Sequence, residues 1–261
     1  LAAGVEGILA AGFAEDVVVA TGAGLHSRTV SEHALALLLA LVRRLPEAGQ
    51  AQERHEWSDE LGGLQPLHPE GRLTTLLCAR VLIWGFGSIG QTLAPMLQGL
   101  GAQVRGAARS AGTRAGVEVI AEADVPAALP DTDVLVNILP ATERTAGIVG
   151  REVLAALPVH AILVNVGRGT VVDEEALLDA LDDGRIGYAA LDVTAVEPLP
   201  ADSRLWASSS WAENRPVRTP PSATTHAPVS VAMSTTAAGL KRLAYSSASH
   251  STRRPDRKSV V

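Results

Sequence analysis

The sequence predicts an α/β fold built on a doubly wound parallel sheet. From residue 80 onward, short apolar runs alternate with helix-like segments, which is typical of parallel strands joined by right-handed helical crossovers. The apolar runs are continuous, as expected for strands that helices cover on both faces. Hydrophobic residues make up 47% of the chain and aromatic residues only 3%, so we expect a core of Ala, Val and Leu.

The expected elements follow one another in regular order. The strand-like runs are residues 81–84, 103–107, 117–120, 134–139, 162–166 and 188–193, and the helical segments among them are residues 89–100, 125–129, 151–157 and 174–182. Nearer the start, residues 16–20 resemble a short buried strand. Residues 27–45 resemble a long helix that is apolar on most faces, which places it in a core or at a subunit interface.

Proline and composition set the expected boundaries of the remaining segments. Pro46 is expected to end the long helix, and residues 48–75 are expected to form a polar connection. Towards the other end, residues 229–243 are rich in Ala, Met and Leu and are expected to form a helix. Residues 246–261 are rich in Ser and Arg and are expected to be a disordered tail.

Bulk composition narrows the class of protein. The net charge of −6 argues against nucleic-acid binding, and no apolar run approaches the length of a membrane span. A single cysteine, Cys78, excludes an internal disulfide and favours a reducing, cytoplasmic compartment. The chain begins at Leu1 rather than at a methionine, so we expect it to be N-terminally incomplete.

The most informative stretch is a glycine turn between an apolar run and a helix. Gly85, Gly87 and Gly90 stand at G-x-G-x-x-G spacing. The first glycine permits a tight turn, the second lets the backbone approach a pyrophosphate, and the third lets helix and strand pack closely. Ser88 and Ile89 begin the helix, whose free N–H groups favour phosphate binding. This turn predicts a dinucleotide site.

The end of the second strand bears on the choice of dinucleotide. About twenty residues past the glycine turn, NAD-binding proteins carry an acidic residue that bonds the ribose 2′-hydroxyl. The local residues here are Ala108, Arg109 and Ser110, with no carboxylate. We therefore expect NADP to be favoured over NAD, with Arg109 and Ser110 on the 2′-phosphate. The alternative is an arginine that simply faces solvent.

Polar residues gather after several strands, where open parallel sheets bind their ligands. These clusters are residues 137–143, 165–169, 190–193 and 197–200. Arg168 lies between Gly167 and Gly169 directly after a strand, so its guanidinium could hold a carboxylate and polarise a carbonyl. The alternative is an ordinary surface arginine. His33, on the apolar helix, is expected to be an interface or core histidine.

These motifs together resemble the D-isomer-specific 2-hydroxyacid dehydrogenases, the family of glyoxylate/hydroxypyruvate reductases and phosphoglycerate dehydrogenases. The resemblance covers about residues 1–206. The matching residues are Val30-Ser31-Glu32-His33, Gly85-Phe86-Gly87-Ser88-Ile89-Gly90, Leu139-Pro140 with Thr142 and Thr145, Asn165-Val166-Gly167-Arg168-Gly169, Val172-Asp173-Glu174, Ala190-Leu191-Asp192-Val193 and Glu197-Pro198.

The resemblance implies roles for individual residues. Arg168 would bind the substrate carboxylate and carbonyl oxygen, Glu197 would pair with a catalytic histidine, and Asp192 would hold the nicotinamide carboxamide. It also implies a homodimer, and it adds these residues to the cofactor site: Leu139, Pro140, Thr145, Val166 and Gly167.

The resemblance also implies a division into domains. Residues 1–27 would be the remnant of a truncated, flavodoxin-like substrate domain. Residues 28–228 would be an NAD(P)-binding Rossmann domain, and residues 229–261 a C-terminal helix with the disordered tail.

The sequence departs from its family at the catalytic histidine. The family's histidine follows a Thr-Pro or Ser-Pro step, which here reads Thr219-Pro220, and the next position holds Pro221. His226 lies further on, and we do not assign it the catalytic role. One hypothesis is that residues 207–221 are a disrupted segment.

Two functions stay open. The first is an oxidoreductase that transfers a hydride between NAD(P)H and a small 2-keto or 2-hydroxy acid, impaired by the missing histidine. The second is a non-catalytic dinucleotide-binding module that acts as a redox sensor or binds a partner.

Overall fold

A computed structural model of the chain describes residues 22, 24–59, 61–62, 72–207 and 230–233. Its centre is an eight-stranded sheet in the order β3-β4-β2-β1-β5-β6-β7-β8. Every neighbouring pair is parallel except β3 with β4, which confirms the predicted doubly wound sheet. The strands are β1 (Arg80–Trp84), β2 (Gln103–Ala108), β3 (Gly112–Arg114), β4 (Val117–Ala121), β5 (Val134–Asn137), β6 (Ile162–Asn165), β7 (Tyr188–Leu191) and β8 (Ser230–Met233).

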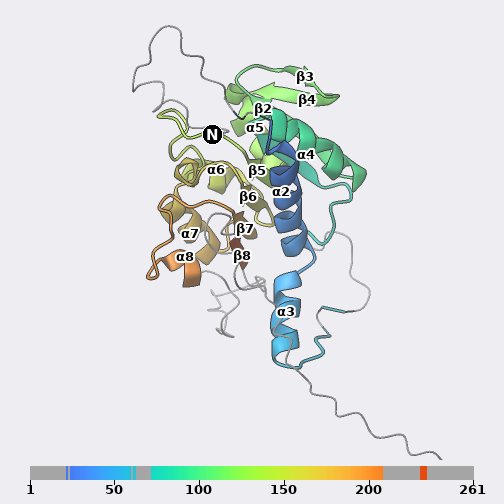
Figure 1. The fold of residues 1–261 in the computed structure, drawn as a ribbon, viewed down its shortest axis with the longest axis vertical. Helices are drawn as coiled ribbons and strands as arrows, with labels where there is room; N and C mark the ends of the chain where they lie inside the picture. The colour runs from blue at the N-terminus through green and yellow to red at the C-terminus, as the bar shows by residue number, and fades with distance from the viewer. Residues whose placement is uncertain (1–21, 23, 60, 63–71, 208–229, 234–261) are drawn as a thin grey trace, which may run out of the picture.

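Helices cover both faces of the sheet (Figure 1). One face carries α2 (Ser27–Val42) and α4 (Ser88–Gly99), and the other carries α5 (Val125–Ala128), α6 (Arg151–Ala156), α7 (Glu174–Asp182) and α8 (Arg204–Ala207). Alternate β1 residues supply the two cores: Val81 and Ile83 pack towards α2 and α4, whereas Leu82 and Trp84 pack on the other face. Short 3-10 turns are η1 (Glu122–Asp124), η2 (Leu129–Asp131) and η3 (Gly169–Val171).

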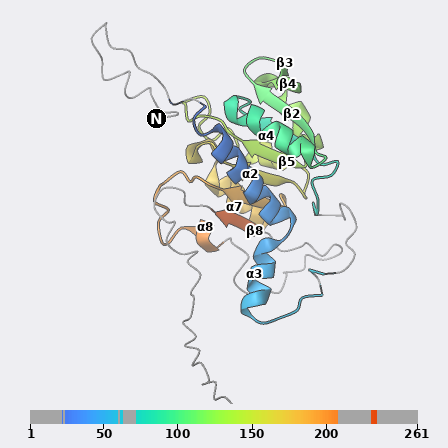
Figure 2. The same cartoon turned by 45° about the vertical axis from the view of Figure 1, so that its right-hand side comes forward.

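The long helix was predicted wrongly at its C-terminal end. The helix α2 stops at Val42, and a second helix, α3 (Leu45–Glu53), follows and extends away from the sheet (Figure 2). Arg44, with φ of 53°, makes the joint between them. Pro46 therefore begins a helix rather than ending one, because a proline in the first turn gives up an N–H group that has no helical partner there.

The expected helix at residues 229–243 was also wrong over its first residues. Ser230–Met233 form β8, which pairs in parallel with β7 and continues the sheet past the expected boundary at residue 228. A short apolar run fits a strand as well as a helix, and the free edge of β7 offers a template for strand pairing. The predicted strand at residues 16–20 and the predicted tail lie outside the described residues.

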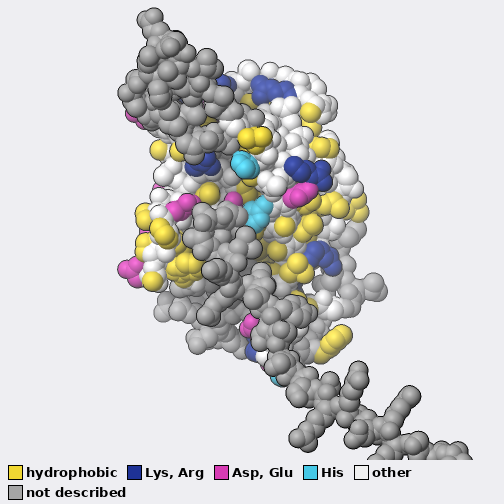
Figure 3. Space-filling view, in the orientation of Figure 1, with side chains coloured by type: hydrophobic (Ala, Val, Ile, Leu, Met, Phe, Trp, Pro, Cys, Tyr) yellow, Lys and Arg dark blue, Asp and Glu magenta, His cyan; other side chains and the backbone are white. Residues whose placement is uncertain are grey.

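The apolar face of α2 is mostly core. Ala34, Leu38 and Leu41 are buried against the sheet, while Leu35 and Leu39 are partly buried. Figure 3, which views the molecule from the side of α2 and α4, shows hydrophobic side chains among charged ones on this surface. None of the helices in the described ranges is long and apolar enough to cross a membrane.

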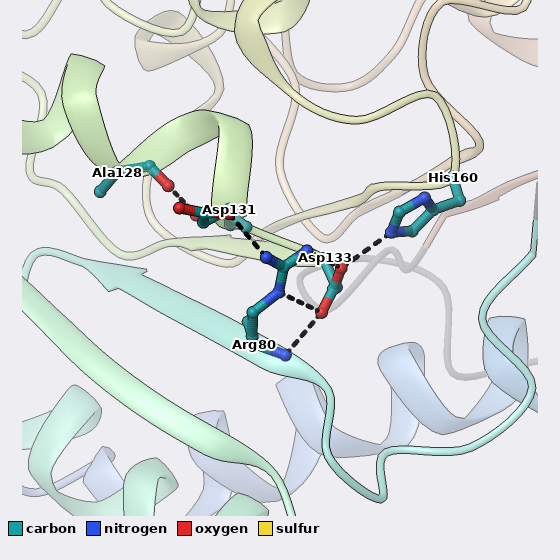
Figure 4. A network of polar contacts seen from close by, with 6 residues as sticks. Arg80, Ala128, Asp131, Asp133 and His160 are labelled. Carbon is teal, nitrogen blue, oxygen red and sulfur yellow. Dashed lines mark hydrogen bonds and ion pairs between the residues drawn. The ribbon is translucent and has the colours of Figure 1, made fainter. Parts of the chain in front are cut away.

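A charged network holds the amino edge of the sheet (Figure 4). Both Asp133 carboxylate oxygens accept hydrogen bonds from the Arg80 guanidinium, at 2.9 and 3.1 Å, and His160 Nε2 lies 2.8 Å from one of them. Arg80 also reaches Asp131 at 2.8 Å. Burial disfavours the ionised form of Asp133, but these hydrogen bonds outweigh it and lower the pKa of the carboxyl from 3.8 to about 2.

Candidate functional site

The carboxyl ends of five neighbouring strands form one continuous edge of the sheet. These strands follow the order β2, β1, β5, β6, β7 in the sheet, so the direction of winding reverses between β1 and β5, where open α/β sheets bind their ligands. The backbone continues the ladder past each strand end. Gly85 donates to Ala107 O at 3.0 Å, Ile138 to Trp84 O at 2.8 Å, Val166 to Asn137 O at 3.1 Å and Asp192 to Asn165 O at 2.9 Å.

The glycine turn has the geometry that its spacing predicts. Gly85 has φ of 99°, and a Cβ there would lie 2.8 Å from the backbone carbonyl of Ile138. A Cβ on Gly90 would lie 3.2 Å from Cγ2 of Ile83 on β1, so helix and strand do pack closely. By contrast, a Cβ on Gly87 would meet nothing within 4 Å. The middle glycine therefore faces open space, as a backbone that receives a ligand should.

The start of α4 suits an anion. Gly87 is the N-cap, no side chain caps the helix, and its first turn contains no acidic residue. The first N–H groups of a helix have no helical acceptor and carry the positive end of its dipole. Ser88 is exposed beside them, and Ile89 is partly buried. The residues present thus fit the pyrophosphate of a dinucleotide.

The loops that follow β5 and β6 touch one another. A Cβ on Gly167 would lie only 2.6 Å from Leu139 O, so this contact requires glycine. Within the first loop, the buried Thr145 hydroxyl donates to Pro140 O at 2.6 Å and accepts from Thr142 N at 2.9 Å. Thr145 therefore shapes the loop that carries Leu139 and Pro140.

A second close approach joins the loops that carry Arg168 and Glu197. A Cβ on Gly169 would lie 1.9 Å from the backbone carbonyl of Thr194, which leaves no room for any side chain. Glu197 Oε1 accepts a hydrogen bond from Thr194 N at 3.1 Å. Arg168 is exposed, and its Nη1 donates to Gly167 O at 2.7 Å. The two predicted catalytic residues thus lie on loops in direct contact.

Two asparagines with no role predicted from the sequence hold these loops. Asn137 and Asn165 are fully buried partners on β5 and β6, and Asn137 Nδ2 donates to Asn165 Oδ1 at 2.8 Å. Asn137 Oδ1 accepts from Leu139 N at 3.3 Å. Asn165 Oδ1 also accepts from Gly167 N at 3.1 Å, and Asn165 Nδ2 donates to Arg168 O at 3.2 Å. The sequence signal for this pair is an asparagine at the last position of two apolar strands that follow one another in the chain.

Asp192 meets a residue from the opposite end of the described chain. His33 Nε2, on α2, lies 3.2 Å from Asp192 Oδ1, and both side chains are largely buried. His33 was predicted as an interface or core histidine, and the structure shows it partly buried against a candidate site residue. This contact shows that α2 reaches the carboxyl edge of the sheet, where Asp192 follows β7.

The predicted NADP residues also lie on this edge. Arg109 and Ser110 follow β2 directly and are exposed. Since Gly85 and Phe86 both donate to Ala107 O, the glycine turn lies beside the end of β2. Pro221 and His226 lie outside the described residues. Within the described ranges, no group of three or more His, Cys, Asp or Glu side chains could hold a metal ion.

Comparison with protein families identifies the domain. Residues 35–216 match the family model described as "D-isomer specific 2-hydroxyacid dehydrogenase, NAD binding domain". The chain is 37% identical over 181 residues to glyoxylate/hydroxypyruvate reductase B of Enterobacter agglomerans, covering 69% of this chain and 54% of that protein. It is 36% identical over 188 residues to the reductase B of Yersinia pestis (strain Pestoides F), with the same coverage. The chain therefore spans about half the length of these curated relatives.

Solved structures give the same assignment. A D-isomer-specific 2-hydroxyacid dehydrogenase from Xanthobacter autotrophicus Py2, crystallised with NADPH and MES, matches with a TM-score of 0.62 and 32% identity over 80% of this chain and 57% of that one. An NADPH-dependent glyoxylate/hydroxypyruvate reductase from Sinorhizobium meliloti, crystallised with NADP and sulfate, matches with a TM-score of 0.66 and 31% identity over 88% and 66% of the two chains. The chain belongs to the D-isomer-specific 2-hydroxyacid dehydrogenase family, and most of it is that family's NAD-binding domain.

Proposed function

We propose that this chain is the cofactor-binding part of an oxidoreductase that transfers a hydride between NAD(P)H and a small 2-keto or 2-hydroxy acid. The observation that carries the proposal is the shared edge: the turn at Gly85–Gly90 and the loop at Arg168 are joined through the Leu139 backbone, which a Cβ on Gly85 or on Gly167 would strike. A dinucleotide on the turn therefore extends towards Arg168.

Each residue has a task that its position allows. The nicotinamide supplies or takes the hydride when it is bound. Arg168, exposed between two glycines, binds the substrate carboxylate and polarises its carbonyl oxygen. Asp192 orients the nicotinamide carboxamide, and Glu197 is the carboxylate partner for a proton donor. Leu139, Pro140, Val166 and Gly167 form the wall against which the cofactor lies.

NADP is the proposed cofactor. Arg109 and Ser110 stand where an NAD-binding protein carries a carboxylate, and β2 ends in Ala108 without one. NADPH and NADP are the cofactors in the Xanthobacter and Sinorhizobium crystals, which supports the proposal. We further propose a homodimer, a soluble cytoplasmic location and no nucleic-acid or membrane partner. A cytoplasmic location suits the free, exposed thiol of Cys78.

The missing histidine favours a second function. With Pro221 in the position of the proton donor, the chain could be a non-catalytic NADP-binding module that senses redox state or binds a partner. A general acid contributes about 10²- to 10⁴-fold to rate. Turnover by the unchanged chain should therefore be low under either function.

One assay separates the two functions. NADPH oxidation is followed with glyoxylate or hydroxypyruvate, using the natural chain and a Pro221→His variant. Turnover in the variant but not in the natural chain supports an oxidoreductase that has lost its proton donor. Cofactor binding without turnover in both proteins supports the binding module, and absence of NADPH and NADH binding in both contradicts both functions.

A further inference from the structure

A second arginine reaches the end of β2 from a different segment. After Ala108 the chain crosses the end of β4 and returns as the edge strand β3, whose last residue is Arg114. Its guanidinium turns back towards the loop after β2. Arg114 Nη2 donates to Ser110 O at 3.0 Å and lies 3.1 Å from the Ser110 hydroxyl oxygen. Arg114 therefore lies against one of the two residues proposed to bind the 2′-phosphate.

A tight turn fixes Arg114 in this position. The turn between β3 and β4 consists of Ala115 and Gly116, with φ of 50° and 76°. Two successive residues at positive φ form the type of hairpin turn that matches the twist of the flanking strands, although alanine is disfavoured there. This turn sets Arg114 opposite Val117 and so determines how far its side chain stands from Ser110.

Among the described residues, no carboxylate neutralises the positive charges of Arg109 and Arg114. Thr113 lies opposite Glu118, so those two side chains share one face of the hairpin while Arg114 projects from the other. Neither Arg109 nor Arg114 forms an ion pair within the part of the chain that the structure describes. The Arg114 guanidinium thus accompanies the Ser110 hydroxyl, and Arg109 is the preceding residue of the same loop, an arrangement suited to a phosphate dianion.

We infer that Arg114 is a specificity-determining residue that binds the 2′-phosphate of NADP together with Arg109 and Ser110. The inference rests on the proposed function, because it assumes that a dinucleotide lies on the glycine turn. It assigns the choice of NADP over NAD to two separate segments, the loop after β2 and the hairpin formed by β3 and β4.

Cofactor titration of the full chain tests this assignment. NADPH and NADH are titrated separately, by nicotinamide fluorescence, into the natural chain and into Arg114→Gln, Arg114→Lys and Arg109→Gln variants. Arg114→Gln should weaken NADPH binding on the order of tenfold and leave NADH binding unchanged, because NADH carries no 2′-phosphate. Arg114→Lys should give an intermediate loss, since lysine keeps the charge but not the planar fork.

Two further measurements control the test. Adenosine 2′,5′-bisphosphate should compete with NADPH for the natural chain and compete less well for Arg114→Gln. Arg54→Gln removes an exposed arginine at the end of α3, paired with Glu56, and should leave both titrations unchanged. A loss in Arg54→Gln equal to that in Arg114→Gln would mean a general effect of charge and would overturn the assignment.

The remaining outcomes separate this inference from the proposed function. Unchanged NADPH affinity in Arg114→Gln, or equal losses for NADPH and NADH, would reduce Arg114 to a support for the Ser110 loop and overturn the inference alone. A natural chain that prefers NADH would overturn it as well, while leaving a dehydrogenase domain in place. A natural chain that binds neither cofactor would contradict the proposed function and the inference together.

Discussion

At the amino edge of the sheet Asp133 joins Arg80 and His160 through charged contacts, whereas at the carboxyl edge Asn137 and Asn165 join the loops through neutral amides. Charges at the amino edge satisfy one another and hold strand starts together. At the carboxyl edge, close glycine contacts and the asparagine pair join the loops. The Arg168 side chain there donates to a backbone carbonyl, that of Gly167. Arg80 at the amino edge pairs with carboxylates, whereas Arg168 at the carboxyl edge forms no ion pair within the described residues and is available to a ligand.

The largest effect should come from Gly169, the tightest contact of the carboxyl edge. Gly169→Ala places a Cβ 1.9 Å from the Thr194 carbonyl, where both partners are backbone and neither can move aside cheaply. We expect the free energy of unfolding to fall by about 3 kcal/mol and NADPH binding to weaken. Denaturant unfolding and cofactor titration measure the two effects.

Gly99→Ala is the matched control, because a Cβ on that residue at the end of α4 would meet nothing within 4 Å. It should leave stability within about 1 kcal/mol of the natural chain. If Gly169→Ala were as stable as Gly99→Ala, the close contact between the Arg168 and Glu197 loops would be wrong.

The asparagine pair should come next. Asn165→Ala leaves the Asn137 amide, Gly167 N and Arg168 O without their buried partner, which should cost about 2 kcal/mol of stability. Because both loops lose their anchor, cofactor affinity should fall as well. Asn165→Asp keeps the acceptor for Gly167 N and should keep more of the binding. Loss of stability with full NADPH affinity would show that the pair does not position the site.

The amino edge should respond differently from the carboxyl edge. Asp133→Asn removes the negative charge that pairs with Arg80 and His160. The lowered pKa of Asp133 corresponds to about 2 kcal/mol of stability. NADPH affinity should not change, since the network lies at the other end of the strands. Reduced affinity in a variant that remains folded would break the distinction between the two edges.

The same carboxyl predicts a pH dependence. Its pKa is 3.8 in the unfolded chain and about 2 in the folded one, so the ionised group contributes its full stability above pH 3.8. That contribution is lost as the pH falls towards 2. The stability difference between the natural chain and Asp133→Asn should therefore shrink as the pH falls from 3.8 towards 2.

The smallest effect on stability should accompany a clear effect on binding. Gly87 faces open space, so Gly87→Ala should fold as the natural chain does. The added methyl group would occupy the space in which a pyrophosphate approaches the backbone, and NADPH and NADH should both bind about tenfold more weakly. Unchanged affinity for both cofactors would move the phosphate site away from this turn.

Local sequence patterns predicted most of the sheet and of its carboxyl edge. The alternation of apolar runs and helices gave the six strands from β1 to β7 other than β3, and the spacing of Gly85, Gly87 and Gly90 gave the turn. These features depend on residues close together in the sequence. The family assignment, reached from several motifs in one order, was confirmed by the match over residues 35–216.

What the sequence did not reveal depends on contacts between distant segments. The role of Asn137 needs its partner on another strand, and His33 meets Asp192 only because α2 packs across the sheet. The strand β8 needs the free edge of β7, and α3 begins at Leu45 because Arg44 adopts a left-handed conformation. Periodicity along the chain carries no information about such pairings.

Hydrogen exchange with and without saturating NADPH compares the two edges in one experiment, because it reports the backbone amides of both. We expect slower exchange at the turn Gly85–Gly90 and in the loops at Leu139 and Gly167–Arg168. Exchange around Arg80, Asp133 and His160 should not change. Protection around the amino edge, or cofactor binding with no protection at the glycine turn, would contradict this expectation.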